Sequence, residues 1–265
     1  MNFNISMSVN NESKDLKRMQ RQFVFGAAML VPISPFLFIQ GQITRWKVGL
    51  LPDAAGDKYG RAAAANVSED AATLFVIGES TVAGLGARDH EHAMAGQFAL
   101  ALSEYLGRAV DWEVAGMNGV TARRLIDEVL PAMPDKPFDH ILLGIGGNDV
   151  IKLSSPRKWR RDMLELISRV RELQPQAAIF ISNCPMILSS PAIPEPIKSI
   201  LWRLSRMHDA NIREFTKDLE RVFYFPQPDD VRGEGFFADG IHPSERGYKD
   251  WAFEMVQYFS ETYKW

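Results

Sequence analysis

The chain has 265 residues, of which 46% are hydrophobic and 24% are charged, proportions that are ordinary for a soluble globular protein. Its formal net charge of -3 leaves no basic excess, so the composition gives no support to a nucleic-acid partner. The single cysteine, Cys184, excludes an intrachain disulfide and a cysteine-based zinc site.

The N-terminal segment combines positive charge with a long apolar run. Four basic residues lie between positions 14 and 21, an apolar run follows over 23–39, and the next charge is Arg45. Positive charge before an apolar run is typical of an exported segment whose N-terminus stays in the cytoplasm. Pro32 and Pro35 would bend or interrupt a helix that spans a bilayer. The pattern therefore fits an anchor or signal-like segment, and it also fits an apolar arm that packs on the domain or on a membrane surface.

Three parts of the chain are predicted from these patterns. Residues 1–50 form the N-terminal segment, with the anchor or signal-like stretch at about 23–40. The Ala-, Gly- and Asp-rich residues 51–71 form a linker, and 72–265 form one domain. We expect association with a membrane and a domain outside the cytoplasm, with a cytoplasmic location as the alternative.

After the linker, short apolar runs alternate with helical patterns, which predicts an α/β fold with a mostly parallel sheet. The expected strands cover residues 74–77, 110–114, 140–143, 178–182 and 222–225. The expected helices cover residues 92–106, 121–130, 156–173, 197–219 and 243–263. Ligands bind at the carboxyl ends of the strands in such sheets, so the loops that follow the strands are the places to look for a site.

A candidate nucleophile follows the first strand. Ser80 stands in Gly78-Glu79-Ser80, between a strand end and a helical region, where helix N-terminal amides can stabilise an oxyanion. Serine in this position also commonly caps the next helix, and on its own that alternative is favoured. Val82 stands where the Gly-x-Ser-x-Gly elbow needs its second glycine, which argues against an α/β-hydrolase fold.

The second and third strands are followed by loops that offer hydrogen-bond donors. Gly116 follows the second strand and can let the backbone approach a ligand closely, although on its own a tight turn before the next helix is the favoured explanation. Asn148 follows the third strand, and its side-chain amide can donate to an anionic oxygen. Gly, Asn and Asp are also ordinary turn residues, so neither loop decides the matter alone.

The last strand is followed by a carboxylate and an imidazole. Asp239 and His242 are three residues apart on a turn, which can place the carboxylate beside one imidazole nitrogen and leave the other free as a base. The alternative is a solvated loop without function. A polar cluster over 89–92 is interpreted as a helix entry rather than a metal site, and no metal site is expected.

The four loops in this order resemble the SGNH (GDSL-like) hydrolase family. The matching blocks are Gly78-Glu-Ser80, Gly116, Gly146-Gly-Asn148-Asp149 and Asp239-Gly-Ile-His242, and they span roughly residues 73–263. The resemblance implies a three-layer α/β/α sandwich with a five-stranded parallel sheet and no metal or organic cofactor. The departure is Glu79, where the family usually has Asp, so the local hydrogen bonding is expected to differ.

The resemblance also implies roles for the site residues. Ser80 is the expected nucleophile, His242 its base and Asp239 the residue that orients the base. The expected oxyanion donors are the backbone N–H groups of Ser80 and Gly116 and the side-chain amide of Asn148.

The expected activity is serine-dependent hydrolysis of carboxylic esters of small to medium acyl groups through an acyl-enzyme. The alternatives are a lysophospholipase or thioesterase, which the apolar N-terminus favours, and a carbohydrate O-deacetylase. A membrane-tethered binding domain is the alternative from another class of protein. The complete set of site residues argues against it, because a binding domain needs no base beside a serine.

Overall fold

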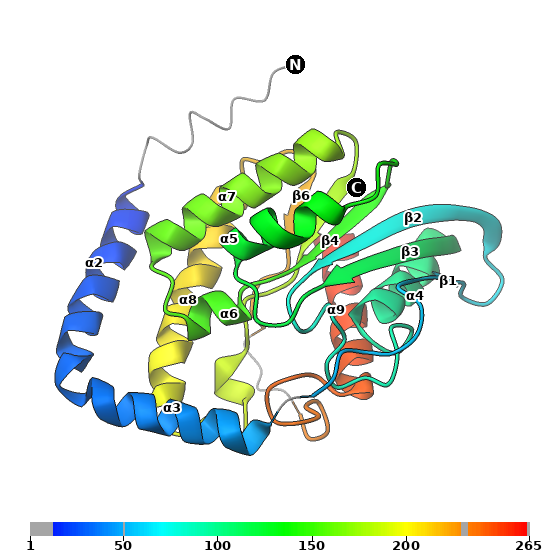
Figure 1. Cartoon of the computed structure of the whole chain (residues 1–265). Coiled ribbons are helices and arrows are strands. Elements are labelled where there is room, and N and C mark those ends of the chain that lie inside the picture. The colour runs from blue at the N-terminus through cyan, green and yellow to red at the C-terminus, as the bar shows by residue number, and fades with distance from the viewer. Residues whose placement is uncertain (1–12, 50, 229–232, 264–265) are drawn as a thin grey trace.

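The computed structural model describes residues 13–49, 51–228 and 233–263. Its centre is a six-stranded sheet with the order β1-β3-β2-β4-β5-β6 (Figure 1). The parallel strands are β2 (Ser68–Gly78), β3 (Arg108–Gly116), β4 (His140–Gly144), β5 (Ala178–Ile181) and β6 (Val222–Tyr224). These correspond to the five strands expected from the sequence.

The expected strand count of five was too low by one. Strand β1 (Tyr59–Ala62) pairs antiparallel with β3 at the sheet edge, inside the stretch expected to be a linker. It has four residues and no buried side chain, so it carries no apolar pattern that the sequence could reveal. Two local contacts hold it to β3. Arg61 forms a salt bridge with Asp111 at 2.6 Å, and Gly60 leaves room for the indole of Trp112, which lies 2.6 Å from where a Cβ would stand.

Two apolar cores, one on each face of the sheet, give the three layers that were expected. Along β2, Leu74 and Val76 belong to one core and Phe75 and Ile77 to the other, as the alternation of a strand requires. The first core is covered by α4 (Met94–Leu106) and α9 (Glu245–Thr262). The second is covered by α5 (Ala122–Arg124) with the π-helix η2 (Leu125–Val129), by α7 (Pro156–Leu173) and by α8 (Ile197–Thr216). Short elements fill the loops: η3 (Leu130–Ala132), α6 (Gly147–Ile151) and η4 (Ile187–Ser189).

The N-terminal segment forms two helices outside this sandwich. Helix α2 (Lys14–Leu30) is followed by a 3₁₀ turn, η1 (Val31–Ile33), and by α3 (Ser34–Val48). Pro32 lies in the turn, and the two helices meet there at a sharp bend (Figure 1). In the described part of the chain, Lys14–Val48 is the one helical stretch that is long and apolar enough to cross a membrane.

The two N-terminal helices contact the domain differently. Helix α2 buries Leu16 and Met19, and its Gln20 accepts a hydrogen bond from the N–H of Arg157 at the start of α7. Helix α3 buries no residue, and its Gln40 amide donates to the carbonyl of Glu195 at 2.7 Å.

Candidate active site

Ser80 lies directly beyond the carboxyl end of β2, a central strand. The chain passes from β2 to β3 on one side and later returns to place β4 on the other, so the loops after these three strands meet at a topological switch point. A tight turn follows the strand, in which the N–H groups of Val82 and Ala83 both donate to the carbonyl of Glu79. Ser80 is only 7% exposed, and its hydroxyl faces His242 rather than capping a helix.

The structure brings Ser80, His242 and Asp239 into one chain of hydrogen bonds. The Ser80 Oγ lies 3.2 Å from His242 Nε2, and His242 Nδ1 lies 2.8 Å from Asp239 Oδ2. The other Asp239 oxygen accepts the backbone N–H groups of Ile241 and His242 at 2.8 and 2.7 Å. A carboxylate beside Nδ1 selects the tautomer that carries its proton there, which leaves Nε2 free to accept a proton from Ser80.

The charge state of Asp239 fits this arrangement. Partial burial alone would raise its pKa, but hydrogen bonds from the His242 ring and from the two backbone N–H groups outweigh that effect. The pKa of Asp239 is therefore held below its ordinary value, and the carboxylate stays ionised beside the imidazole.

Asn148 lies on the same rim, and Glu79 holds its side chain. The Asn148 Nδ2 donates to Glu79 Oε2 at 2.7 Å, and the same oxygen accepts the Asn148 backbone N–H at 2.9 Å. The other oxygen of Glu79 accepts the N–H of Gly147 at 2.7 Å. Because a carboxylate only accepts, it fixes which end of the Asn148 amide points toward it. A side-chain amide has two N–H groups, so one is left to serve a ligand.

Glu79 is buried, and its neighbours shift its pKa in opposite directions. Burial and, to a smaller extent, the nearby Asp149 raise its pKa to about 7, even though hydrogen bonds from the N–H groups of Asn148 and Gly147 and from the Asn148 side chain lower it. The sequence marked this residue only as a departure from the family pattern. Its contacts assign it a positioning function toward Asn148.

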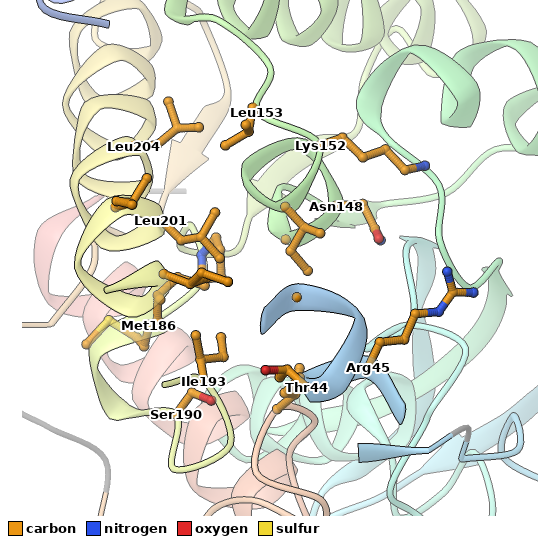
Figure 2. Close-up of a pocket in the computed structure, with 18 of the residues that line it drawn as sticks. Thr44, Arg45, Asn148, Lys152, Leu153, Met186, Ser190, Ile193, Leu201 and Leu204 are labelled. Atoms are coloured by element: carbon orange, nitrogen blue, oxygen red, sulfur yellow. The ribbon is translucent and has the colours of Figure 1, made fainter. Parts of the chain in front are cut away.

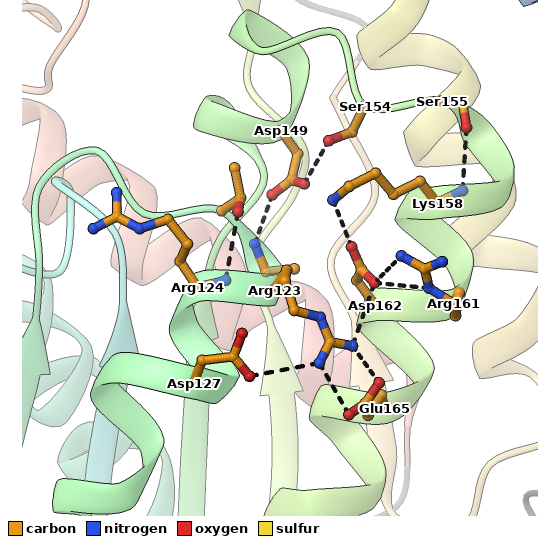
Figure 3. A network of polar contacts seen from close by, with 12 residues as sticks. Arg123, Arg124, Asp127, Asp149, Ser154, Ser155, Lys158, Arg161, Asp162 and Glu165 are labelled. Carbon is orange, nitrogen blue, oxygen red and sulfur yellow. Dashed lines mark hydrogen bonds and ion pairs between the residues drawn. The ribbon is translucent and has the colours of Figure 1, made fainter.

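Asp149 connects the second and third loops of the site (Figure 3). Its side chain is fully buried and accepts the Ala122 N–H at 2.8 Å and the Ser154 hydroxyl at 2.9 Å. A second set of contacts lies nearby, in which the buried Asp162 pairs with Lys158, Arg161 and Arg123. Asp149 thereby ties the loop that carries Asn148 to the segment that follows the Gly116 loop. Sequence reasoning gave Asp149 no such function, although its place beside Asn148 in a Gly-Asn-Asp turn was a visible signal.

Gly116 is required by a close approach of two backbones. A Cβ at this position would lie 2.1 Å from the Ala83 nitrogen and 2.5 Å from the Ala83 Cα, in the turn that carries Ser80. Gly78, Gly116 and Gly144 are register partners on three adjacent strands. The structure thus places Gly116 against the turn that carries Ser80.

A large cavity connects the Ser80 region with the N-terminal helices (Figure 2). Its volume is about 1900 Å³, and its lining includes Ser80, Asn148 and His242 together with residues of α3 and α8. Apolar side chains such as Leu201, Leu204 and Ile193 lie on one side of it in Figure 2, and Asn148, Lys152 and Arg45 lie on the other.

Among the described residues, no group of three or more His, Cys, Asp or Glu side chains is placed to hold a metal ion.

Solved structures with this fold include several hydrolases. The lipase Lip_vut3 from a goat rumen metagenome is 15% identical with a TM-score of 0.54, over 71% of this chain and 96% of that one. A carbohydrate esterase family 2 enzyme from Corynascus thermopiles (Myceliophthora fergusii) is 15% identical with a TM-score of 0.51, over 73% and 67% of the two chains. A GDSL-like lipase structure from Bacteroides ovatus is 16% identical with a TM-score of 0.52, over 74% and 54%. At these identities the likeness shows a shared fold.

The sequence itself was compared with curated proteins and with protein families. No curated protein matches it significantly. The model of the GDSL-like lipase/acylhydrolase family matches residues 76–249, which is more than half of the chain and includes all four loops of the site. The chain therefore belongs to the GDSL-like lipase/acylhydrolase family.

Proposed function

We propose that this protein is a serine esterase that hydrolyses carboxylic esters through an acyl-enzyme. The observation that carries the proposal is the hydrogen-bonded chain Ser80–His242–Asp239, with 3.2 Å between Ser80 Oγ and His242 Nε2 and 2.8 Å between His242 Nδ1 and Asp239 Oδ2. Nucleophile and base within hydrogen-bond reach, with the base oriented by a third group, are what covalent acyl transfer requires.

In this mechanism His242 Nε2 takes the proton of Ser80 as the Ser80 oxygen attacks the ester carbonyl carbon. Asp239 stabilises the imidazolium that forms. When the tetrahedral intermediate collapses, the imidazolium protonates the leaving alcohol and the acyl group stays on Ser80. A water molecule then loses a proton to His242 and attacks the acyl carbon, which releases the acid and restores the Ser80 hydroxyl.

The negative charge on the tetrahedral oxygen needs donors that are already in place. We assign this function to the backbone N–H groups of Ser80 and Gly116 and to the N–H of Asn148 that Glu79 does not take. The hydrogen bonds from Asn148 and Gly147 to Glu79 support the assignment, because they fix the Asn148 amide before substrate arrives. Losing one such donor typically costs about 2.7–4 kcal/mol of transition-state stabilisation.

The size of the cavity indicates how long the acyl chain of the substrate can be. Small-molecule sites usually enclose about 300–1,000 Å³, whereas the cavity beside Ser80 has about 1900 Å³ and is lined mainly by apolar residues. This favours the lipid-directed alternative over the small to medium acyl groups expected from the sequence.

The test is hydrolysis of p-nitrophenyl esters from acetate to palmitate by the full chain and by Ser80→Ala. We expect Ser80→Ala to lose almost all turnover while its circular dichroism stays unchanged. Thr81→Ala removes the neighbouring hydroxyl in the same turn and should keep most of the activity. Equal turnover by wild type and a folded Ser80→Ala protein would disprove the serine mechanism. If neither protein turns over, failure of a serine-directed phosphonate to label the wild type would favour a binding domain.

A further inference from the structure

Helix α3 has one side toward the domain and an apolar stripe on the side that points away from it. Its outward stripe consists of Phe36, Ile39, Ile43 and Trp46, at the spacing i, i+3, i+7 and i+10 that places them on one face. These side chains are 57%, 58%, 48% and 81% exposed, and none of them lines the cavity. Four large apolar side chains exposed along one helix face mark a surface that binds a partner or a membrane.

The outward stripe is part of a larger apolar surface. Seventeen large hydrophobic side chains are exposed among the described residues, and ten of them lie between positions 24 and 46. Such a concentration marks an interaction surface rather than the scattered apolar residues of an ordinary exterior.

The inward face of α3 belongs to the wall of the active-site cavity. Phe38, Gly41, Thr44 and Arg45 line the same cavity as Ser80 and His242. Whatever covers the outward face of α3 therefore lies one helix diameter from the space beside the nucleophile, about 10 Å.

The charges around this surface favour an anionic partner. From position 16 to position 52 the chain has five basic residues and no acidic one, within a protein whose net charge is -3. The basic residues lie at both ends of the apolar run, at positions 17–21 and 45–47, and the run between them is uncharged. Basic residues that flank an apolar surface are typical of binding to anionic lipid headgroups.

We propose that α3 and the second half of α2 lie in the plane of an anionic membrane surface, and that the cavity receives a lipid ester from that membrane. The acyl chain would occupy the apolar side toward α8, and the anionic headgroup would lie toward Arg45 and Lys152 (Figure 2). This inference rests on the serine esterase function proposed above, and it names the substrate class as an acyl lipid with an anionic headgroup.

The contacts of the two helices favour this in-plane position over a membrane-spanning one. The bend at η1 separates α2 from α3, and each helix is attached to the domain, α2 through Leu16, Met19 and Gln20 and α3 through Gln40. A single straight helix over 22–44 would reach across a bilayer, but it would remove α3 from the cavity wall and break the contact of Gln40 with Glu195.

The first test measures binding of the full chain to phosphatidylcholine vesicles with and without phosphatidylglycerol. The variant Phe36→Ser/Ile43→Ser/Trp46→Ser should lower the partition coefficient on anionic vesicles by about 100-fold. The matched control is Tyr59→Ser/Tyr105→Ser/Leu173→Ser, which removes three exposed apolar side chains from other elements and should bind as the wild type does. Both variants should hydrolyse a soluble short-chain ester at the wild-type rate. Unchanged vesicle binding by the α3 variant would overturn the proposal. A variant that differs from the wild type in oligomeric state and not in vesicle binding would also overturn it, because the stripe would then be a contact between two copies of the chain.

The second test measures how deeply positions of α2 and α3 lie in the bilayer. Cys184 is 1% exposed, so a cysteine placed at position 24, 33 or 43 can be labelled selectively with an environment-sensitive fluorophore. Quenching by brominated lipids should show the three positions at similar, shallow depth. A label at position 33 in the bilayer centre, with 24 and 43 near the surfaces, would identify a spanning helix and overturn the in-plane position.

The third test compares substrates. Long-chain lysophosphatidylglycerol in vesicles should be cleaved with a kcat/KM at least about tenfold lower by the α3 variant than by the wild type. Arg45→Gln should raise KM for lysophosphatidylglycerol and leave KM for monoacylglycerol unchanged; equal changes for both would overturn the assignment of the headgroup. If the wild type hydrolyses soluble esters but not vesicle lipids, only this inference fails. If it hydrolyses no ester in a Ser80-dependent way, the proposed function fails first.

Discussion

Replacing Glu79 by Gln tests whether this buried carboxylate prepares Asn148 for catalysis. The substitution keeps the size of the side chain and replaces one of its two acceptor oxygens by an NH₂ group, which only donates. Glu79 accepts three N–H groups, one from Gly147 and two from Asn148, at 2.7–2.9 Å. In either orientation of the new amide, at least one of these donors would face another donor.

The size of the effect follows from these contacts. A hydrogen bond to a charged group is worth about 1.5–3 kcal/mol, and a neutral one about 1 kcal/mol. If the Asn148 amide loses its orientation completely, the cost is that of one oxyanion donor, about 10²–10³ in kcat. Because Gln can still hold Asn148 through its oxygen in one orientation, we expect kcat to fall by roughly 10- to 100-fold, with KM nearly unchanged.

The assay is steady-state hydrolysis of a soluble ester by Glu79→Gln, Asn148→Ala and the double variant. If Glu79 acts through Asn148, the double variant is no slower than Asn148→Ala, because the second substitution removes a partner that is already lost. Rate losses that multiply in the double variant would refute this reasoning. Glu79→Asp, the usual family residue, should recover part of the lost rate.

A pH titration of stability gives an independent check on Glu79. Its pKa is about 7 in the folded protein against 4.5 ordinarily, so the folded state binds more protons between these values. The protonation of Glu79 therefore contributes about 3 kcal/mol to the free energy of unfolding. This contribution is fully present below pH 4.5 and is lost as pH rises through 7. Glu79→Gln should lack this decline in the free energy of unfolding, measured by urea titration at each pH. An identical decline in the variant would assign the titration to another group.

Three further substitutions probe other parts of the site and the core. Asp239→Asn should lower kcat by about 10³ or more without loss of fold in circular dichroism, because the amide would face Nδ1 and favour the tautomer whose Nε2 carries the proton. Gly116→Ala should lower both the melting temperature and the activity, since its Cβ would lie 2.1 Å from the Ala83 nitrogen. The control Gly26→Ala, in the interior of α2 with no atom within 4 Å, should lower neither in differential scanning fluorimetry and the ester assay. His208 is buried and its pKa falls to about 3, so its own contribution to stability should fall by about 2 kcal/mol as pH falls from 6.5 to 5. The protonation of Glu79 acts in the opposite direction over this range, so the quantity to follow in the urea titrations is the difference between wild type and His208→Gln, which should shrink by that amount.

The approximate positions of the site residues were predictable because the topology of the sheet determines where the loops after its strands lie. Parallel strands bring their carboxyl ends to one edge, so polar residues directly after successive strands meet there whatever the rest of the sequence is. Ser80 and Asn148 follow the ends of β2 and β4 closely and could be placed on one rim in this way. His242 lies well beyond the end of β6 at Tyr224, and its expected function came from the family resemblance of the four loops together. The function of Glu79 could not be predicted, because it depends on which way a side chain turns in a buried loop. Strand β1 was missed for a related reason: an exposed edge strand held by Arg61 and Gly60 leaves no apolar alternation to read.

The N-terminal segment marks the point where sequence patterns stop deciding between structures. An uncharged run with basic ends satisfies the requirements of a spanning helix, a signal segment and an in-plane helix alike, because all three respond to the same hydrophobic free energy. The in-plane position that we propose rests on a few specific contacts: Pro32 in a 3₁₀ turn, Gln40 on the carbonyl of Glu195, and a cavity shared with Ser80. A spanning helix would leave the inward face of α3 without its contacts to the domain, and a free arm would leave its outward stripe in water. The position that we propose, between the domain and a membrane, would satisfy both faces and would place Ser80 beside the surface from which a lipid ester would come.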